Sequence, residues 1–286
     1  MISDYKDLTP LQMRHIIREG KFTEPTSGLC PGYAQANLII LRKEHAYDFL
    51  LFAQRNPKAC PVLEVLDTGS RFTRFVAQDC DIAKDFPKYR IYEKGVCTGE
   101  YTDVEQFWSD DLVGFLIGCS FSFESEMIEA GIEMRHNTMG RNVPMYITGI
   151  DTVPAGVFSG KMVVSMRPVP PQQVVKAVTV TAQLPKVHGS PIHIGDPSVI
   201  GIKDINHPEF GDPVEIKEGE VTMFWPCGVT PQSVVMNVKP DFAITHAPGH
   251  MLLLDIKNQL KNADINRMSP LDAFDLIREL KKTAGL

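Results

Sequence analysis

The spacing of apolar residues predicts a chain of alternating helices and strands. Thr9, Pro10 and Gln12 form a helix start signal, in which threonine caps, proline takes the first turn and glutamine closes a capping box. The short apolar run 38–41 is typical of a strand. Residues 44–55 repeat apolar side chains at helical spacing, so a helix is expected there.

Further elements are expected up to residue 124. Residues 60–66 read as a strand, and the irregular residues 67–88 read as a surface excursion. Residues 90–98 predict a hairpin that turns at Lys94-Gly95. The stretch 118–124 then follows an apolar segment, and we expect it to lie where one helix ends and another begins.

The pattern of elements changes after residue 125, and this change suggests two domains. Residues 126–186 hold enough helices and strands for a small two-layer unit of their own. Strand-like runs then resume at 191–194, 221–225, 242–246 and 251–255. We therefore expect a discontinuous main domain of residues 1–125 and 187–255, with the smaller domain 126–186 inserted into it. Residues 256–286 are expected to form a C-terminal helical extension in which Ser269 caps a helix.

Composition narrows the class of protein. The 43% hydrophobic and 22% charged content is ordinary for a globular protein, and the net charge of −6 argues against nucleic acid as a partner. No apolar run approaches the roughly 20 residues of a membrane helix, and the first residues lack the apolar core of a signal peptide. The six cysteines follow no regular spacing, which favours reduced thiols. A soluble protein of a bacterial-type cytoplasm is expected.

The stretch 118–124 is the first candidate site. Cys119, Ser120 and Ser122 lie beside the free N–H groups of an expected helix start, where a carboxylate or phosphate can bind. The alternative is that Ser120 or Ser122 simply caps the helix.

Polar side chains in other loops extend the candidate list. Gln35 and Asn37 precede the first strand, and Arg141 and Asn142 share a loop. An arginine can hold a carboxylate with two parallel hydrogen bonds, although an ordinary surface ion pair explains Arg141 equally well.

Four histidines are candidates for proton transfer. His188 and His193 share a Gly/Pro-rich stretch with Asp196, and His246 and His250 follow a later strand. Each histidine alone is more often structural than catalytic. Together with Asp196 they could hold a metal, but no strict ligand motif is present, and we expect neither a metal nor another cofactor.

A second candidate centre is the turn that contains Cys227 and Thr230. Thr230 is expected to cap a helix, so Cys227 lies in a strand-to-helix loop, where open α/β sheets bind ligands. The helix start could lower the pKa of the thiol and make it nucleophilic. The alternative is that Cys227 is a small buried hydrophobic residue.

Eight segments resemble the D-glutamate cyclase family. The resemblance extends over roughly residues 8–255 and is carried by Pro-Gly-Tyr-Ala-Gln-Ala-Asn (31–37), Leu-Leu-Phe-Ala-Gln-Arg-Asn-Pro (50–57), Gly-Cys-Ser-Phe-Ser-Phe-Glu (118–124), Gly-Arg-Asn-Val-Pro-Met-Tyr (140–146), Val-Val-Ser-Met-Arg-Pro (163–168), Val-His-Gly-Ser-Pro-Ile-His-Ile-Gly-Asp-Pro (187–197), Trp-Pro-Cys-Gly-Val-Thr-Pro-Gln (225–232) and Ile-Thr-His-Ala-Pro-Gly-His-Met (244–251). The resemblance implies a three-layer α/β domain joined to a smaller two-layer α+β domain. It also implies a hydro-lyase, and the member that names the family closes D-glutamate to 5-oxo-D-proline with loss of water.

This chemistry assigns roles to the candidate residues as a hypothesis. Arg141 and Asn142 would hold the α-carboxylate, and Cys119 and Ser120 would face the reacting carboxyl group. The histidines would transfer protons, and Cys227 would be a nucleophile or a packing residue. The expected partner is a small carboxylate or amino acid. Another carboxylate substrate, a non-catalytic binding role and assembly into a homo-oligomer all stay open.

Overall fold

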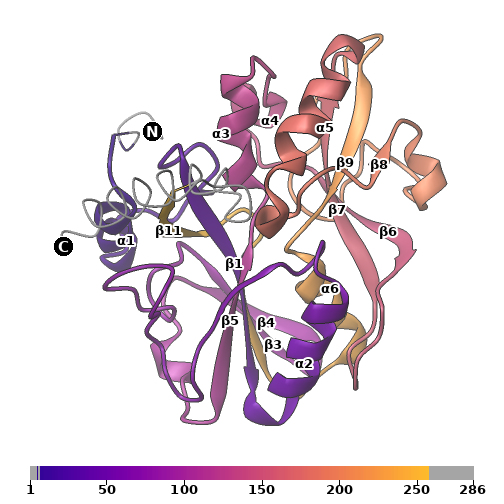
Figure 1. Cartoon of the computed structure of the whole chain (residues 1–286). Coiled ribbons are helices and arrows are strands. Elements are labelled where there is room, and N and C mark those ends of the chain that lie inside the picture. The colour runs from indigo at the N-terminus through magenta and orange to yellow at the C-terminus, as the bar shows by residue number, and fades with distance from the viewer. Residues whose placement is uncertain (1–4, 6, 258–286) are drawn as a thin grey trace, which may run out of the picture.

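The computed structural model describes residue 5 and residues 7–257, and it contains two antiparallel sheets with helices around them (Figure 1). The expected helix with Ser269 lies outside the described residues. The helices are α1 (Pro10–Arg18), α2 (Lys43–Arg55), α3 (Phe121–Glu129), α4 (Arg135–Thr138), α5 (Val174–Ala182) and α6 (Thr230–Val238), with 3-10 turns η2 (Glu105–Phe107), η3 (Pro171–Gln173), η4 (Pro185–Val187) and η5 (Pro197–Ile200). The strands are β1 (Tyr33–Arg42), β2 (Val62–Val65), β3 (Tyr89–Glu93), β4 (Val96–Tyr101), β5 (Leu112–Gly118), β6 (Met145–Asp151), β7 (Lys161–Val169), β8 (His193–Ile194), β9 (Val221–Pro226), β10 (Ala243–His246) and β11 (Leu252–Lys257).

Strand β1 is the centre of the larger, seven-stranded sheet. The strand order is β2-β5-β1-β10-β3-β4, and β11 extends the sheet by pairing with the first part of β1. Ile39 lies opposite Phe115 of β5 on one side and Thr245 of β10 on the other. Side chains of a strand alternate between faces, and both faces of β1 are buried, which explains the continuous apolar run at 38–41.

Two different layers cover the faces of this sheet. Helices α2 and α6 pack on the face that holds Ile39. On the opposite face, residues 66–86 pack on Leu38 and Ile40 without regular secondary structure, although Val76, Ile82 and Phe86 are all buried. The expectation that residues 67–88 form a surface excursion was therefore wrong, because this segment is a core layer.

A buried carboxylate replaces secondary structure in part of that segment. Glu64 accepts hydrogen bonds from the backbone N–H groups of Arg74, Phe75 and Val76. Buried backbone N–H groups need such partners, and here a side chain supplies them in place of a helix or strand. Helix α1 lies next to this layer and packs against Leu253 of β11.

The smaller sheet has the order β6-β7-β9-β8, with α3 and α5 on one face. Trp225 of β9 and Phe123 of α3 meet in that core, with ring centroids 5.5 Å apart. Strands β8 and β9 come from residues 193–226, beyond the range of the expected smaller domain, 126–186. The proposed division of the chain into domains stays a prediction.

Local signals in the sequence were reliable. The capping box of Thr9 and Gln12 is present at α1, and β3 and β4 form the hairpin with Glu93 opposite Val96. The segment before residue 118 was misread, because it is strand β5 and not a helix. Among the described residues, no helix is long and apolar enough to cross a membrane.

Candidate active site at the junction of the two sheets

Five segments meet where the two sheets approach each other, and we call this place the junction (Figure 1). It consists of residues 26–37, 118–124, 165–167, 188 and 227–232. The Nδ2 atom of Asn37 donates to the carbonyl oxygen of Gly118 at 2.8 Å, and the N–H group of Cys119 donates to the Gln35 carbonyl at 3.1 Å. Gly228 lies so close that a Cβ atom there would be 1.9 Å from Asn37 Nδ2. The junction therefore joins segments that are distant in sequence.

A buried ion pair lies at the centre of the junction. Arg167 on β7 is fully buried, and its Nε atom is 3.2 Å from Oε1 of Glu124 on α3. The guanidinium also donates to the hydroxyl oxygens of Ser165 at 2.9 Å and Ser120 at 3.2 Å. Its Cζ atom lies 4.9 Å from the ring centroid of Phe123. Such a charge is stable in the interior only with this many partners.

His136 and Ser27 complete the surroundings of Glu124. The Nε2 atom of His136 is 3.1 Å from Glu124 Oε1, and the Ser27 hydroxyl donates to Oε2 at 3.0 Å. Burial raises the pKa of Glu124, but the charges of His136 and Arg167 lower it more, so that the pKa is about 2. Glu124 is therefore ionised at neutral pH and holds an imidazole and a guanidinium in fixed positions.

A small cavity of about 80 Å³ opens beside Glu124. Gln35, Asn137 and Phe121 contribute to its wall, and the loop of residues 28–33 covers it. In this loop Cys30 has a positive φ of 46°, a backbone conformation that side chains other than glycine rarely adopt.

His188 is another buried titratable group of the junction. Its Nδ1 atom is 2.7 Å from the carbonyl oxygen of Lys58, whereas Nε2 has no partner among the described residues. Burial lowers the pKa of His188 to about 4, while the Lys58 carbonyl favours the protonated ring and the charge of Arg167 opposes it. His188 is therefore neutral at physiological pH.

Cys119 and Cys227 lie in one apolar cluster at the junction. Burial raises the pKa of both thiols, to about 11 for Cys227. The expectation that a helix start lowers the pKa of Cys227 was therefore wrong. The sheets are antiparallel throughout their registered pairs, so the rule for ligand sites in open parallel sheets does not apply to this turn either.

The hydroxyl groups of Ser122 and Thr230 make hydrogen bonds to backbone groups of the junction. Ser122 accepts from the N–H group of Gln35 at 2.9 Å, and Thr230 donates to the Cys227 carbonyl at 2.6 Å. Neither hydroxyl caps a helix. They fix the geometry of the junction.

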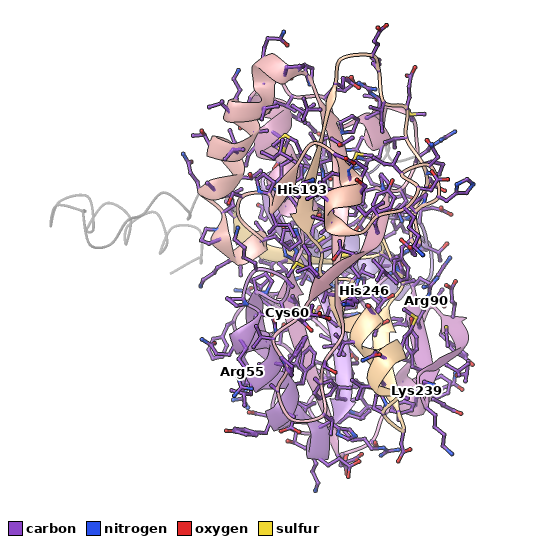
Figure 2. The ribbon with its side chains drawn as sticks, turned by 90° about the vertical axis from the view of Figure 1, so that its right-hand side faces the viewer. Arg55, Cys60, Arg90, His193, Lys239 and His246 are labelled. Carbon is purple, nitrogen blue, oxygen red and sulfur yellow. The ribbon has the colours of Figure 1, made fainter. Side chains whose placement is uncertain are left out.

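Six of the expected residues lie outside the junction, and Arg141, His193 and Asp196 are three of them. Arg141 is exposed and donates to the Pro213 carbonyl. His193 on β8 contacts the backbone of Asp196, 2.7 Å away, at the surface of the smaller sheet. Figure 2 shows His193 in the upper half of the molecule and His246 near its middle.

Asn142, His246 and His250 are near the junction but not in it. The ring of His246 packs near Phe86 on the face of the larger sheet that α6 does not cover. Asn142 and His250 line a separate groove of about 420 Å³ with Lys88 and Arg90. In the part of the chain that the structure describes, no three His, Cys, Asp or Glu side chains are grouped closely enough to hold a metal ion.

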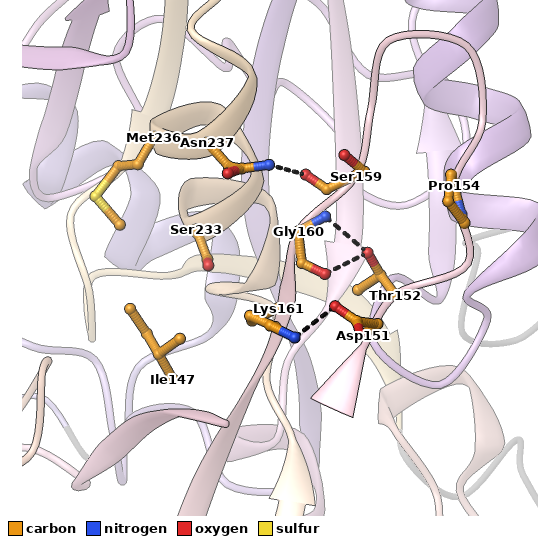
Figure 3. A pocket seen from close by; sticks show the side chains of 10 residues that line it. All are labelled: Ile147, Asp151, Thr152, Pro154, Ser159, Gly160, Lys161, Ser233, Met236 and Asn237. Atoms are coloured by element: carbon orange, nitrogen blue, oxygen red, sulfur yellow. Dashed lines mark hydrogen bonds and ion pairs between the residues drawn. The ribbon is translucent and has the colours of Figure 1, made fainter. Parts of the chain in front are cut away.

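A surface hollow of about 560 Å³, lined by residues between 147 and 161 and between 233 and 237, contains none of the expected site residues (Figure 3). In this hollow Lys161 pairs with Asp151 at 2.6 Å, and Asn237 donates to the Ser159 carbonyl at 2.9 Å. Because it contains none of the expected site residues, this hollow is a weaker candidate than the junction.

Sequence reasoning missed Glu124, His136 and Arg167. Glu124 and Arg167 lie inside segments that carried the family resemblance, but the apolar neighbours of Arg167 favoured a plain core strand. A charged residue inside an apolar strand was the available signal, because such a residue needs a buried partner.

Comparison with known proteins agrees with the resemblance. Residues 113–255 match the family described as D-glutamate cyclase. A protein of Clostridium beijerinckii, named "Putative hydro-lyase", is 69% identical over 89% of this chain and 97% of its own length. The YcsI protein of Bacillus subtilis bears the same description and is 58% identical over 88% of this chain and 98% of its own.

A more distant structural likeness adds no functional information. The crystal structure of a nitrogen repressor-like protein from Methanococcus jannaschii aligns with a TM-score of 0.37 and 10% identity over 86% of this chain and 94% of its own. The family match and the extent of the bacterial similarities are decisive. The chain belongs to the D-glutamate cyclase family.

Proposed function

We propose that this protein is a lyase that removes water from a small carboxylate substrate, and that its reaction is the closure of D-glutamate to 5-oxo-D-proline. The names of its family and of its bacterial relatives support this proposal. The structural observation that carries it is the buried Arg167–Glu124 pair, with His136 bound to the same carboxylate.

The groups of this cluster suit the reaction. In the closure, the α-amine attacks the γ-carboxyl carbon, and negative charge develops on the carboxyl oxygens. A buried guanidinium stabilises that charge more strongly than the same group in water. Arg167 would supply the positive charge, with the Ser120 hydroxyl beside it.

Proton transfer needs a group that can both accept and donate a proton, and an imidazole ring nitrogen does so. Glu124 is too acidic for this task and acts as a positioning residue. It holds His136, whose ring also stacks on Phe121 with centroids 6.3 Å apart. The arrangement thus places a fixed carboxylate beside an imidazole.

The test is incubation of the purified full chain with D-glutamate and, separately, with L-glutamate, followed by chiral detection of 5-oxoproline. Formation of 5-oxo-D-proline from D-glutamate above the uncatalysed rate is the expected result. Absence of product from both enantiomers would overturn the cyclase reaction. Loss of water from another carboxylic acid, without formation of 5-oxoproline, would support a lyase that acts on a substrate other than D-glutamate.

A further inference from the structure

Three hydrogen-bond acceptors at the junction are buried without partners. They are Oδ1 of Asn37, Nε2 of His188 and Oε1 of Gln232; none of them has a partner in hydrogen-bond geometry among the described residues, although the Gly118 carbonyl lies beside the His188 ring. The three side chains are at most 1% exposed. Buried polar atoms in folded proteins nearly always have a partner, so three such atoms in one region indicate a missing group.

In each of these side chains, the hydrogen bonds of the other polar atom identify the atom that has no partner. Asn37 Nδ2 donates to the carbonyls of Gly118 and Ile117, which leaves the oxygen of the amide free. Gln232 Nε2 donates to the His246 carbonyl at 2.6 Å, which leaves Oε1 free. His188 places Nδ1 against the Lys58 carbonyl, so this nitrogen carries the proton and Nε2 presents a lone pair.

The three acceptors belong to one side of the larger sheet. Asn37 is two residues from Ile39, so its side chain points to the face that α2 and α6 cover. Gly228 touches Asn37, and Gln232 lies in the first turn of α6. The His188 ring is adjacent to Gly118, whose carbonyl also binds Asn37. The free Nε2 of His246 lies on the opposite face, beside Phe86.

We propose that these acceptors form the binding site for the primary amine of an amino-acid substrate. This inference rests on the proposed function and narrows its substrate class. An ammonium group offers three N–H donors and a positive charge, which matches three acceptors. A carboxylate has only acceptor atoms and would be repelled, so the carboxyl groups of the substrate belong on the Arg167 side.

The same geometry assigns proton transfer to His188. Its φ of 83° is a left-handed conformation, which is costly for a side chain other than glycine and is kept where the surroundings enforce it. During closure, two protons leave the nitrogen, the C–N bond forms and a C–O bond breaks. Both protons end on the departing oxygen, which leaves as water. Nε2 of His188 accepts each proton and passes it on, so the ring ends unchanged.

Ligand binding tests the amine site separately from turnover. Calorimetric titration of the full chain compares D-glutamate with glutarate, which has both carboxyl groups but no amine. We expect D-glutamate to bind at least about tenfold more tightly, since its amine makes charge-assisted hydrogen bonds that glutarate cannot make. Equal affinity would overturn the proposal and would indicate that water fills the three acceptors.

His188→Asn is the first variant to test. An asparagine amide keeps the donor to the Lys58 carbonyl, tolerates the left-handed backbone and removes Nε2. We expect the preference for D-glutamate to fall below about threefold and kcat to fall about 100-fold, the scale of general base catalysis. His193→Asn is the matched control, since His193 lies outside the junction, and it should leave both values unchanged.

Asn37→Leu is a second variant of similar shape, in case His188→Asn does not fold. It should reduce the preference for the amine, with circular dichroism confirming the folded state. Full preference in both folded variants would contradict the amine site. If wild-type protein binds D-glutamate over glutarate but forms no 5-oxoproline, the amine site stands and the cyclase reaction fails.

Discussion

The hydroxyl group of Ser120, directly before helix α3, accepts a hydrogen bond from Nη2 of Arg167 at 3.2 Å and makes no bond to the helix. A serine in this position usually caps. Here it instead completes the set of acceptors around a buried guanidinium, so α3 begins at the candidate active site without a side-chain cap.

Arg167→Lys should reduce kcat/KM about 100-fold, because an ammonium cannot replace the planar contacts to Glu124, Ser165 and Ser120. The measurement is 5-oxo-D-proline formation from D-glutamate at several substrate concentrations. Arg141→Lys is the matched control, and its activity should stay within roughly twofold, the range of a surface change. A large loss of activity in Arg141→Lys, with little loss in Arg167→Lys, would indicate that Arg141 binds the carboxylate.

Glu124→Gln should lower the free energy of unfolding by about 3–5 kcal/mol, because it leaves Arg167 charged and buried without its counter-ion. Urea denaturation at pH 7 measures this loss. Glu129→Gln changes an exposed residue of the same helix and should alter stability by less than about 0.5 kcal/mol. Equal stability of the two variants would mean that Arg167 is balanced by other groups.

The free energy of unfolding should fall as the pH decreases from 6.5 to 4. Burial lowers the pKa of His188 from 6.5 to about 4, so in this range the unfolded chain binds a proton that the native state excludes. The contribution of His188 is ~3 kcal/mol, and His246, with a pKa lowered to about 3, adds to the slope. Urea denaturation at pH 7, 5.5 and 4 measures it. The decline should be smaller in His188→Asn, and identical pH profiles would show that His188 is not protonated on unfolding.

Gly228→Ala should disturb the junction through Asn37. The added Cβ would lie 1.9 Å from Asn37 Nδ2, so the amide must move away from the Gly118 carbonyl. We expect a loss of about 1–3 kcal/mol in stability, typical of overpacking, together with reduced turnover. Gly149→Ala has only contacts of 3.6 Å or longer and serves as the control in the same thermal unfolding experiment.

The sequence predicted those features whose causes lie within a few residues. The capping box of Thr9 and Gln12 and the turn at Lys94-Gly95 need no distant partner, and both are present. Glu124 and Arg167 are 43 residues apart, and although a charged residue in an apolar strand indicates a buried partner, nothing near Arg167 identifies that partner as Glu124. Their pairing depends on how α3 lies against β7, which only the assembled fold determines.

The candidate site residues divide into those that lie at the junction and those that do not. Asn37, Cys119 and His188 were expected from motif position and do lie at the junction, whereas Arg141 and His193 were expected for the same reason and lie elsewhere. The sequence around a polar loop residue does not indicate the direction in which its side chain points. The roles of all these residues stay predictions until variants are measured.

The junction draws on residues as far apart in the sequence as Ser27 and Gln232, so it can be completed only late in the synthesis of the chain. Arg167 can meet Glu124 as soon as β7 has formed, but Asn37 gains its neighbour Gly228 only after the turn into α6 has emerged from the ribosome. Contacts of such wide sequence separation form late in folding. A nascent chain that ends before residue 232 would thus carry both charges and still lack the wall against which a substrate amine could be held.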